Sequence, residues 1–139
     1  MRIPAGWAVI FNIFMEFPSG DPPTPAEFEA YRGEDILSAQ RIAFTGEGWA
    51  VDTSADVIDL GWYPGGDPDG TYRLCLVRDG WDNIPVQFEH RDCYAVQKAL
   101  DTLTRMLSEG KRTALIARVL TDPRFLDVPL EPPEPPAPA

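Results

Sequence analysis

Hydrophobic and polar positions follow a two-residue period in the middle of the chain. Between residues 36 and 90 the apolar residues come in short runs bounded by turn formers such as Gly46-Glu47-Gly48. In the best of these runs, Tyr72, Leu74 and Leu76 alternate with polar or smaller residues, which is typical of a strand with one face in the core. Because no helical segment separates the runs, they predict an antiparallel meander. Its strands are expected at 41–45, 49–53, 57–63, 71–78 and 85–89.

A further strand is predicted at residues 7–17. This segment is β-branched and aromatic with few polar breaks, which is typical of a strand covered on both faces for most of its length. Asn12 and Glu16 interrupt it, and it has no small-residue cleavage site, so it does not read as a signal peptide. No stretch approaches the roughly 18 apolar residues that a membrane span requires. We therefore expect a cytoplasmic protein that does not enter the membrane.

A short helix is predicted immediately after a proline-rich turn. Thr24-Pro25-Ala26-Glu27 reads as a capping box, in which the Thr24 hydroxyl accepts from the backbone of Glu27 and the Glu27 carboxylate reaches back. Pro25 suits the first helical position, where its missing N–H costs nothing. The helix is expected to run to about Arg32, to end at Gly33 and to pack through Phe28 and Tyr31.

The period becomes helical after Asp92, a predicted N-cap. Val96, Leu100, Leu103 and Leu107 recur at three- or four-residue steps, Gly110 ends the segment, and a second helix is expected over 111–120. The sequence thus predicts an α+β fold, an antiparallel sheet of five to six strands with a short N-terminal helix and the C-terminal helices packed on one face. We expect one domain over 1–128 and a proline-rich, extended and disordered tail over 129–139.

The charge of the chain is strongly negative and unevenly distributed. The 139 residues include 12 Lys and Arg against 22 Asp and Glu, a net charge of −10. Residues 1–90 hold fifteen acids and five bases, whereas residues 91–124 hold seven bases and four acids. A protein this acidic repels phosphate backbones, so a nucleic-acid partner is excluded and a basic protein partner is expected.

Catalytic and metal-binding patterns are missing from the sequence. His90 is the single histidine, has no nucleophile or orienting partner at a known spacing, and reads as a partly exposed capping residue. Cys75 and Cys93 read as reduced core residues. Asp67-Pro-Asp-Gly70 resembles the opening of a calcium loop, but Thr71 and Tyr72 occupy positions that need an acid and a glycine. We therefore expect no enzyme activity, no metal and no cofactor.

Acidic residues interleaved with large aromatics are the pattern that points to a function. Trp and Tyr near turns, rimmed by carboxylates, are typical of a surface that binds a basic protein. Trp81 lies in an evident turn. Trp49 and Trp62 have the alternative of a core position, and for Trp49, which lies in a strand pattern, core and surface are equally favoured. The candidate partner-binding residues are Glu47, Asp52, Asp56, Asp59, Trp62, Tyr63, Asp67, Asp69, Asp79, Trp81 and Asp82.

The order of these features resembles a known class of proteins. Gly48-Trp49 opens one strand, Gly70-Thr-Tyr-Arg-Leu74 opens another, Trp81 follows in the next turn, and an amphipathic helix comes last. In organisation and composition, residues 41–109 are similar to the immunity proteins of bacterial polymorphic-toxin and contact-dependent growth inhibition systems. The resemblance implies a non-enzymatic antidote, monomeric in its complex, that binds a cognate C-terminal toxin domain, often a basic nuclease, and blocks its active site or substrate groove.

Two other functions fit parts of the sequence. The tail over 129–139 could dock into an SH3-like groove, which would make the chain an assembly or regulatory module. A small ligand-binding or hydrolytic domain could instead use Asp56, Asp59 or His90, because paired carboxylates can perform acid and base chemistry.

Overall fold

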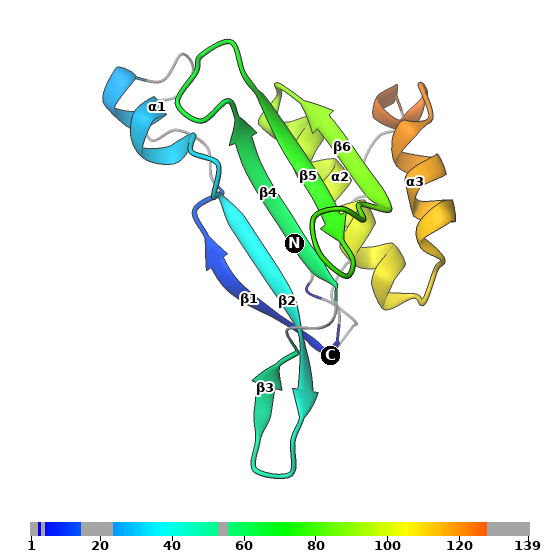
Figure 1. Cartoon of the computed structure of the whole chain (residues 1–139). Coiled ribbons are helices and arrows are strands. Elements are labelled where there is room, and N and C mark those ends of the chain that lie inside the picture. Colours follow the sequence, from blue (N-terminus) through cyan, green and yellow to red (C-terminus); the bar gives the residue numbers. More distant parts are fainter. Residues whose placement is uncertain (1–2, 4, 15–23, 53–55, 128–139) are drawn as a thin grey trace, which may run out of the picture.

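The computed structural model describes residues 3, 5–14, 24–52 and 56–127 and shows an α+β fold (Figure 1). Six strands and three α-helices lie in this part of the chain, and the predicted tail over 129–139 lies outside it. In chain order the elements are β1 (Trp7–Asn12), α1 (Pro25–Tyr31), β2 (Leu37–Phe44), β3 (Trp49–Val51), β4 (Val57–Tyr63), β5 (Thr71–Val77), β6 (Val86–His90), α2 (Cys93–Ser108), α3 (Thr113–Thr121) and the 3₁₀ turn η1 (Phe125–Asp127).

All strand pairs are antiparallel, as the sequence predicts. The sheet has the order β1-β2-β4-β5-β6, and β3 pairs with the far end of β2, beyond the part of β2 that contacts β4. Helices α2 and α3 lie against the β5 and β6 side of one face of the sheet (Figure 1). No helix of the described residues is long and apolar enough to cross a membrane.

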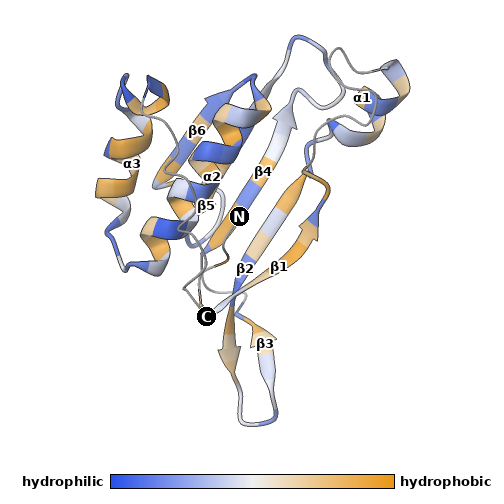
Figure 2. Cartoon of the chain, turned by 180° about the vertical axis from the view of Figure 1, so that it is seen from behind, coloured by the Kyte–Doolittle hydropathy of each residue, from blue (hydrophilic) through white to orange (hydrophobic). Residues whose placement is uncertain are grey.

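The core lies between the sheet and α2. Leu60 of β4 and Leu74 of β5 are fully buried, and Val96, Ala99 and Leu103 of α2 meet them from the helical layer. Figure 2, which views the sheet from the side of the helices, shows hydrophilic residues at intervals along α2. Asp92 caps this helix by accepting from the N–H of Tyr94 at 3.3 Å, which confirms the predicted N-cap. Gly110, with φ of 72°, makes the turn into α3.

Helix α1 closes one end of the sheet. The capping box is present in full: the Thr24 side chain accepts from the Glu27 N–H at 3.2 Å, and the Glu27 carboxylate accepts from the Thr24 N–H at 3.1 Å. Phe28 packs edge to face on Trp62 with ring centroids 5.5 Å apart, as predicted for this helix. The chain then turns inward at Arg32, whose guanidinium lies 4.9 Å above the ring of Tyr72.

Strand β1 differs from the prediction of a segment covered on both faces. It lies at the edge of the sheet, and Val9, Ile10 and Phe11 are exposed, although Figure 2 shows the strand to be hydrophobic along its length. The described strand also ends at Asn12, and residues 15–17 of the predicted strand lie outside the described part of the chain. The reason is topological: an apolar run gives no information about whether neighbouring strands flank it on one side or both.

The face of the sheet opposite α2 carries no helix among the described residues. A single row of side chains crosses it, because Phe11 pairs with Ser38, Ser38 with Asp59, Asp59 with Cys75, and Cys75 with Gln87 in consecutive antiparallel registers. This polar face and the two turns at one end of the sheet hold the residues of interest below.

Candidate protein-binding surface

Among the residues that the structure describes, the most exposed aromatic side chains lie on the hairpin that joins β2 to β3. The turn residues 45–48 close it, with the N–H and the hydroxyl of Thr45 donating to the carbonyl of Gly48 at 2.9 and 3.1 Å. Gly46 has φ of 92°, a conformation that favours glycine. The last pair of the ladder before this turn is Phe44 with Trp49.

Phe44 and Trp49 contact each other edge to face and little else. Their ring centroids are 5.6 Å apart, and the two side chains are 64% and 68% exposed. All three residues of β3 are exposed, so this strand adds no buried residue to the core. The sequence leaves Trp49 open between core and surface; the structure places it on the surface. A pair of aromatic rings held in water by a regular ladder is a preformed apolar contact site.

A second exposed tryptophan occupies the turn between β5 and β6. The Arg78 N–H donates to the Asn83 carbonyl at 2.9 Å and closes the turn. Asp79 has a positive φ of 55°, which aspartate tolerates better than most residues. Trp81 is 59% exposed between the exposed acids Asp79 and Asp82, in agreement with the prediction that it lies on the surface.

Both turns lie at the same end of the sheet. Strands β2 and β5 are each antiparallel to β4 and therefore run in the same direction, so the turns that follow them leave from one edge, with the β2–β3 hairpin extending further (Figure 1). We call this surface the hairpin end. It consists of Phe44, Glu47, Trp49, Asp79, Trp81 and Asp82.

Two other predicted acids lie near this end but have structural partners. Asp56, which precedes β4, accepts from Nε and Nη2 of Arg78 at 3.0 Å each and is largely buried. This bidentate pair ties the start of β4 to the end of β5. Asp52 is half-buried after β3, and its N–H donates to the Arg41 carbonyl at 2.8 Å. Asp56 is therefore assigned to the framework of the hairpin end.

Trp62 is a core residue, so its predicted role as a surface anchor is wrong. It is 4% exposed, packs edge to face on Tyr72 with centroids 4.9 Å apart, and donates its Nε1–H to the Asp67 carbonyl at 2.6 Å. The ring fills the space between α1 and the sheet. The central position of β4 buries it, whereas Trp49 in β3 has no such neighbours.

The remaining residues of the predicted set lie at the opposite end of the sheet. Tyr63 is half-buried, and its hydroxyl donates to the Glu34 carbonyl at 3.4 Å. In the β4–β5 loop, the Asp67 side chain accepts from the Asp69 N–H at 2.9 Å, and Arg91 donates to the Asp69 carbonyl at 3.3 Å. These contacts order the loop, and the structure does not bring this group together with the hairpin end.

Asp59 stands apart from both groups, in the middle of the uncovered face. Burial, together with the nearby charge of Asp35, raises the pKa of Asp59 from 3.8 to about 6. The directly opposite Cys75 is buried, and burial followed by the charge of Asp59 raises the pKa of its thiol to about 11. The thiol therefore stays protonated at neutral pH and is a poor nucleophile.

His90 has the capping role that the sequence predicts. Its Nδ1 accepts from the Asp92 N–H at 2.9 Å, and its ring stacks on Phe88 with centroids 6.2 Å apart. Among the described residues no three His, Cys, Asp or Glu side chains gather as a metal site would require. Sequence reasoning missed two aromatics: Phe44, whose surface position depends on strand pairing, and Phe11, which it assigned to a buried strand.

Comparison with known proteins adds no relative: no protein-family model, no curated protein and no solved structure matches this chain.

Proposed function

We propose that this protein is a non-enzymatic binding protein whose hairpin end captures a basic surface on a protein partner. The observation that carries the proposal is the exposed pair of Phe44 and Trp49, held by a hairpin whose second strand, β3, has no buried residue. An aromatic side chain buries about 150–250 Å² when it is covered, and residues of this kind dominate binding energies. The pair thus has the properties of an anchor.

The charges around the anchor support a basic partner. Glu47, Asp79 and Asp82 are exposed at the hairpin end, and most of the negative charge of the chain lies in its first ninety residues. Opposite charges on two surfaces accelerate encounter and make association sensitive to salt, while the buried aromatics set the dissociation rate.

The resemblance to immunity proteins supports a more specific form of the proposal. A nuclease toxin domain holds phosphates in a basic groove, and the carboxylates of the hairpin end would occupy positions in that groove where phosphates bind. The antidote would then act by steric and electrostatic occlusion. In this form of the proposal the protein works in the cytoplasm, and neither Cys75 nor Cys93 forms a disulfide, as expected for a reducing compartment.

The decisive experiment measures binding to the protein domain encoded immediately upstream of this chain. Association and dissociation rates are measured for the wild type and for the double variant Glu47→Lys with Asp82→Lys. Asp79 is left unchanged because its positive φ makes lysine a strained replacement. The matched control is Glu29→Lys with Asp69→Lys, which changes the net charge equally at the opposite end of the sheet.

We expect the association rate of the hairpin-end variant at low salt to fall about tenfold or more. The control should change it much less. Equal effects of the two double variants would mean that only net charge matters, and the hairpin end would lose its role. If the upstream domain does not bind the wild type at all, the immunity form of the proposal fails.

A further inference from the structure

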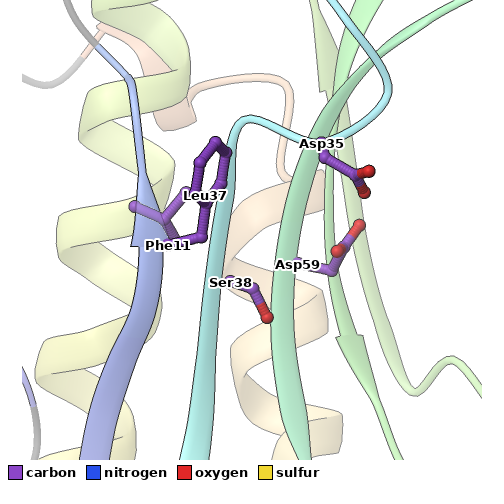
Figure 3. Close-up of a pocket in the computed structure, with 5 residues that line it drawn as sticks. All are labelled: Phe11, Asp35, Leu37, Ser38 and Asp59. Atoms are coloured by element: carbon purple, nitrogen blue, oxygen red, sulfur yellow. The ribbon is translucent and has the colours of Figure 1, made fainter.

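A cavity of about 300 Å³ opens on the uncovered face of the sheet, away from the hairpin end (Figure 3). Phe11 of β1 forms its apolar side, whereas Leu37 of β2 lines it although it is only 2% exposed and its side chain belongs to the core. Ser38 and Asp59 contribute from neighbouring strands, and Asp35 reaches it from the segment before β2. The volume is at the lower end of the range for small-molecule sites, so an occupant would be small.

The negative charges of the two carboxylates in this cavity are not balanced by an ion pair among the described residues. Figure 3 shows the oxygens of Asp35 and Asp59 turned toward each other. Within the described part of the chain, neither carboxylate has a hydrogen bond or an ion pair with a protein group. Arg73, a cation on the neighbouring strand β5, is engaged by Glu89 at 2.8 Å and by the ring of Tyr63 at 4.6 Å.

This arrangement works against the stability of the protein. The mutual repulsion of Asp35 and Asp59 and the burial of Asp59 both oppose ionisation, and they raise the pKa of Asp59. Asp59 nevertheless lies on the central strand β4, where the residues on either side of it, Ile58 and Leu60, are apolar and buried in the core. A cation placed between the two carboxylates would remove the repulsion and supply the missing hydrogen-bond donors.

The chemistry of the walls distinguishes between kinds of cation. Two carboxylates and one hydroxyl are too few for calcium, which takes six to eight oxygen ligands, and no cluster of three or more metal-ligating side chains exists among the described residues. The ring of Phe11 offers nothing to a hydrated metal ion. It does suit an alkyl stem, and an aromatic ring also attracts an organic cation.

We propose that this cavity binds a small organic cation, a primary ammonium or guanidinium group on an apolar stem. The charged group lies between Asp35 and Asp59, and the stem packs against the ring of Phe11. An ammonium has three donors and a guanidinium five, which is enough to satisfy both carboxylates and the Ser38 hydroxyl. This site is independent of the proposed binding of a protein at the hairpin end.

The test is a titration of the full chain, followed by NMR, with n-butylammonium and n-butylguanidinium chloride. We expect saturable shifts of the amide signals of Phe11, Leu37 and Ser38. Asp35→Asn and Asp59→Asn should each weaken the affinity about tenfold or more, because each removes a charged acceptor. The matched control Asp69→Asn, an exposed acid in the β4–β5 loop, should bind as the wild type does.

Three outcomes would overturn the proposal. Neutral n-butanol binding as well as the cations would leave only an apolar pocket, and calcium chloride producing the same saturable shifts would indicate a metal site. Unchanged affinity in both aspartate variants would remove the carboxylates from the site. Both variants are expected to fold, because Asp35 is exposed and Asp59→Asn removes a charge whose burial is unfavourable.

A parallel titration with Nα-acetyl-lysine methylamide distinguishes a free amine from a lysine side chain of a protein. Equal affinities for this compound and n-butylammonium would support a lysine side chain of a protein as the source of the ammonium group. Binding of n-butylammonium alone would support a free small molecule.

Discussion

The rings of Phe44 and Trp49 meet edge to face across β2 and β3 while both side chains stay about two-thirds exposed. An aromatic pair of this geometry is worth roughly 0.5–1.5 kcal/mol beyond its burial. Here that energy orients the two rings and stiffens the hairpin, since β3 has no buried residue. The pair is thus ordered before a partner arrives, which lowers the entropy lost on binding.

Replacing Trp49 with alanine should separate binding from stability. The ring is exposed and contacts Phe44, so Trp49→Ala is expected to lower the free energy of unfolding by no more than the worth of the aromatic pair, about 0.5–1.5 kcal/mol. Binding to the upstream-encoded domain should weaken by about 2 kcal/mol or more, through faster dissociation. Urea unfolding and surface plasmon resonance measure the two effects. Leu115→Ala, an exposed apolar residue on α3, is the matched control and should leave both unchanged.

Trp62→Ala should show the opposite behaviour. Its ring fills the space between α1 and the sheet and contacts Phe28 and Tyr72, so truncation is expected to cost about 3–5 kcal/mol of the free energy of unfolding. The measurement is urea unfolding of the variant beside Trp49→Ala. A small loss of stability in Trp62→Ala would contradict its place in the core.

The pair formed by Asp56 and Arg78 should contribute to the stability of the hairpin end. Two hydrogen bonds of 3.0 Å join a largely buried carboxylate to a partly exposed guanidinium. We expect Asp56→Ala to lower the free energy of unfolding by about 2 kcal/mol, because it also leaves part of Arg78 without its acceptor. A double-mutant cycle with Arg78→Ala tests this, and additive effects of the two changes would show that the pair has no coupling.

The raised pKa of Asp59 gives a pH dependence of definite sign. Its value is about 6 in the folded protein and 3.8 in the reference state, so the folded chain holds the proton more tightly. Between these values stability therefore falls as pH rises, and the loss is complete above pH 6. Asp59→Asn should be more stable than the wild type at pH 7 by about 1 kcal/mol, a value reduced for solvent screening of a half-buried group. Near pH 3 the difference should vanish. Urea unfolding across this range measures it, and a wild type that gains stability between pH 4 and 6 relative to the variant would contradict the prediction.

Gly61 determines where Asp35 lies. A Cβ at this position would come 2.0 Å from the Glu34 carbonyl oxygen, so the segment before β2 approaches the sheet only because the glycine has no side chain. We expect Gly61→Ala to lower the free energy of unfolding by about 3 kcal/mol and to weaken binding of n-butylammonium. Gly33→Ala is the control, since its nearest heavy atom would be 4.0 Å away. Urea unfolding and the NMR titration check both effects.

Local patterns were enough to predict most of the elements. The alternation in β5, the capping box before α1 and the helical period after Asp92 are all confirmed, and so is the antiparallel arrangement. Strand β2 begins at Leu37, four residues before the predicted run, because Ser38 and Gln40 dilute its apolar pattern on the uncovered face.

The same patterns could not predict which tryptophans are buried or which acidic residues lie close together. Trp49 and Trp62 each follow a glycine and open or continue a strand, yet one is exposed and the other buried. The difference arises from pairing partners far away in sequence: β4 has neighbours on both sides, whereas β3 pairs beyond the end of the main ladder. Asp35 and Asp59 meet for the same reason, through a register that no local spacing encodes.

The common direction of β2 and β5 has a consequence for how many ligands the protein can hold at once. Because both turns leave from one edge of the sheet, a partner that covers the hairpin end approaches along the strand axis, whereas the cavity opens perpendicular to it. The two occupants would not compete for space. Saturating one site should therefore leave the dissociation constant of the other unchanged, so the two binding free energies should add.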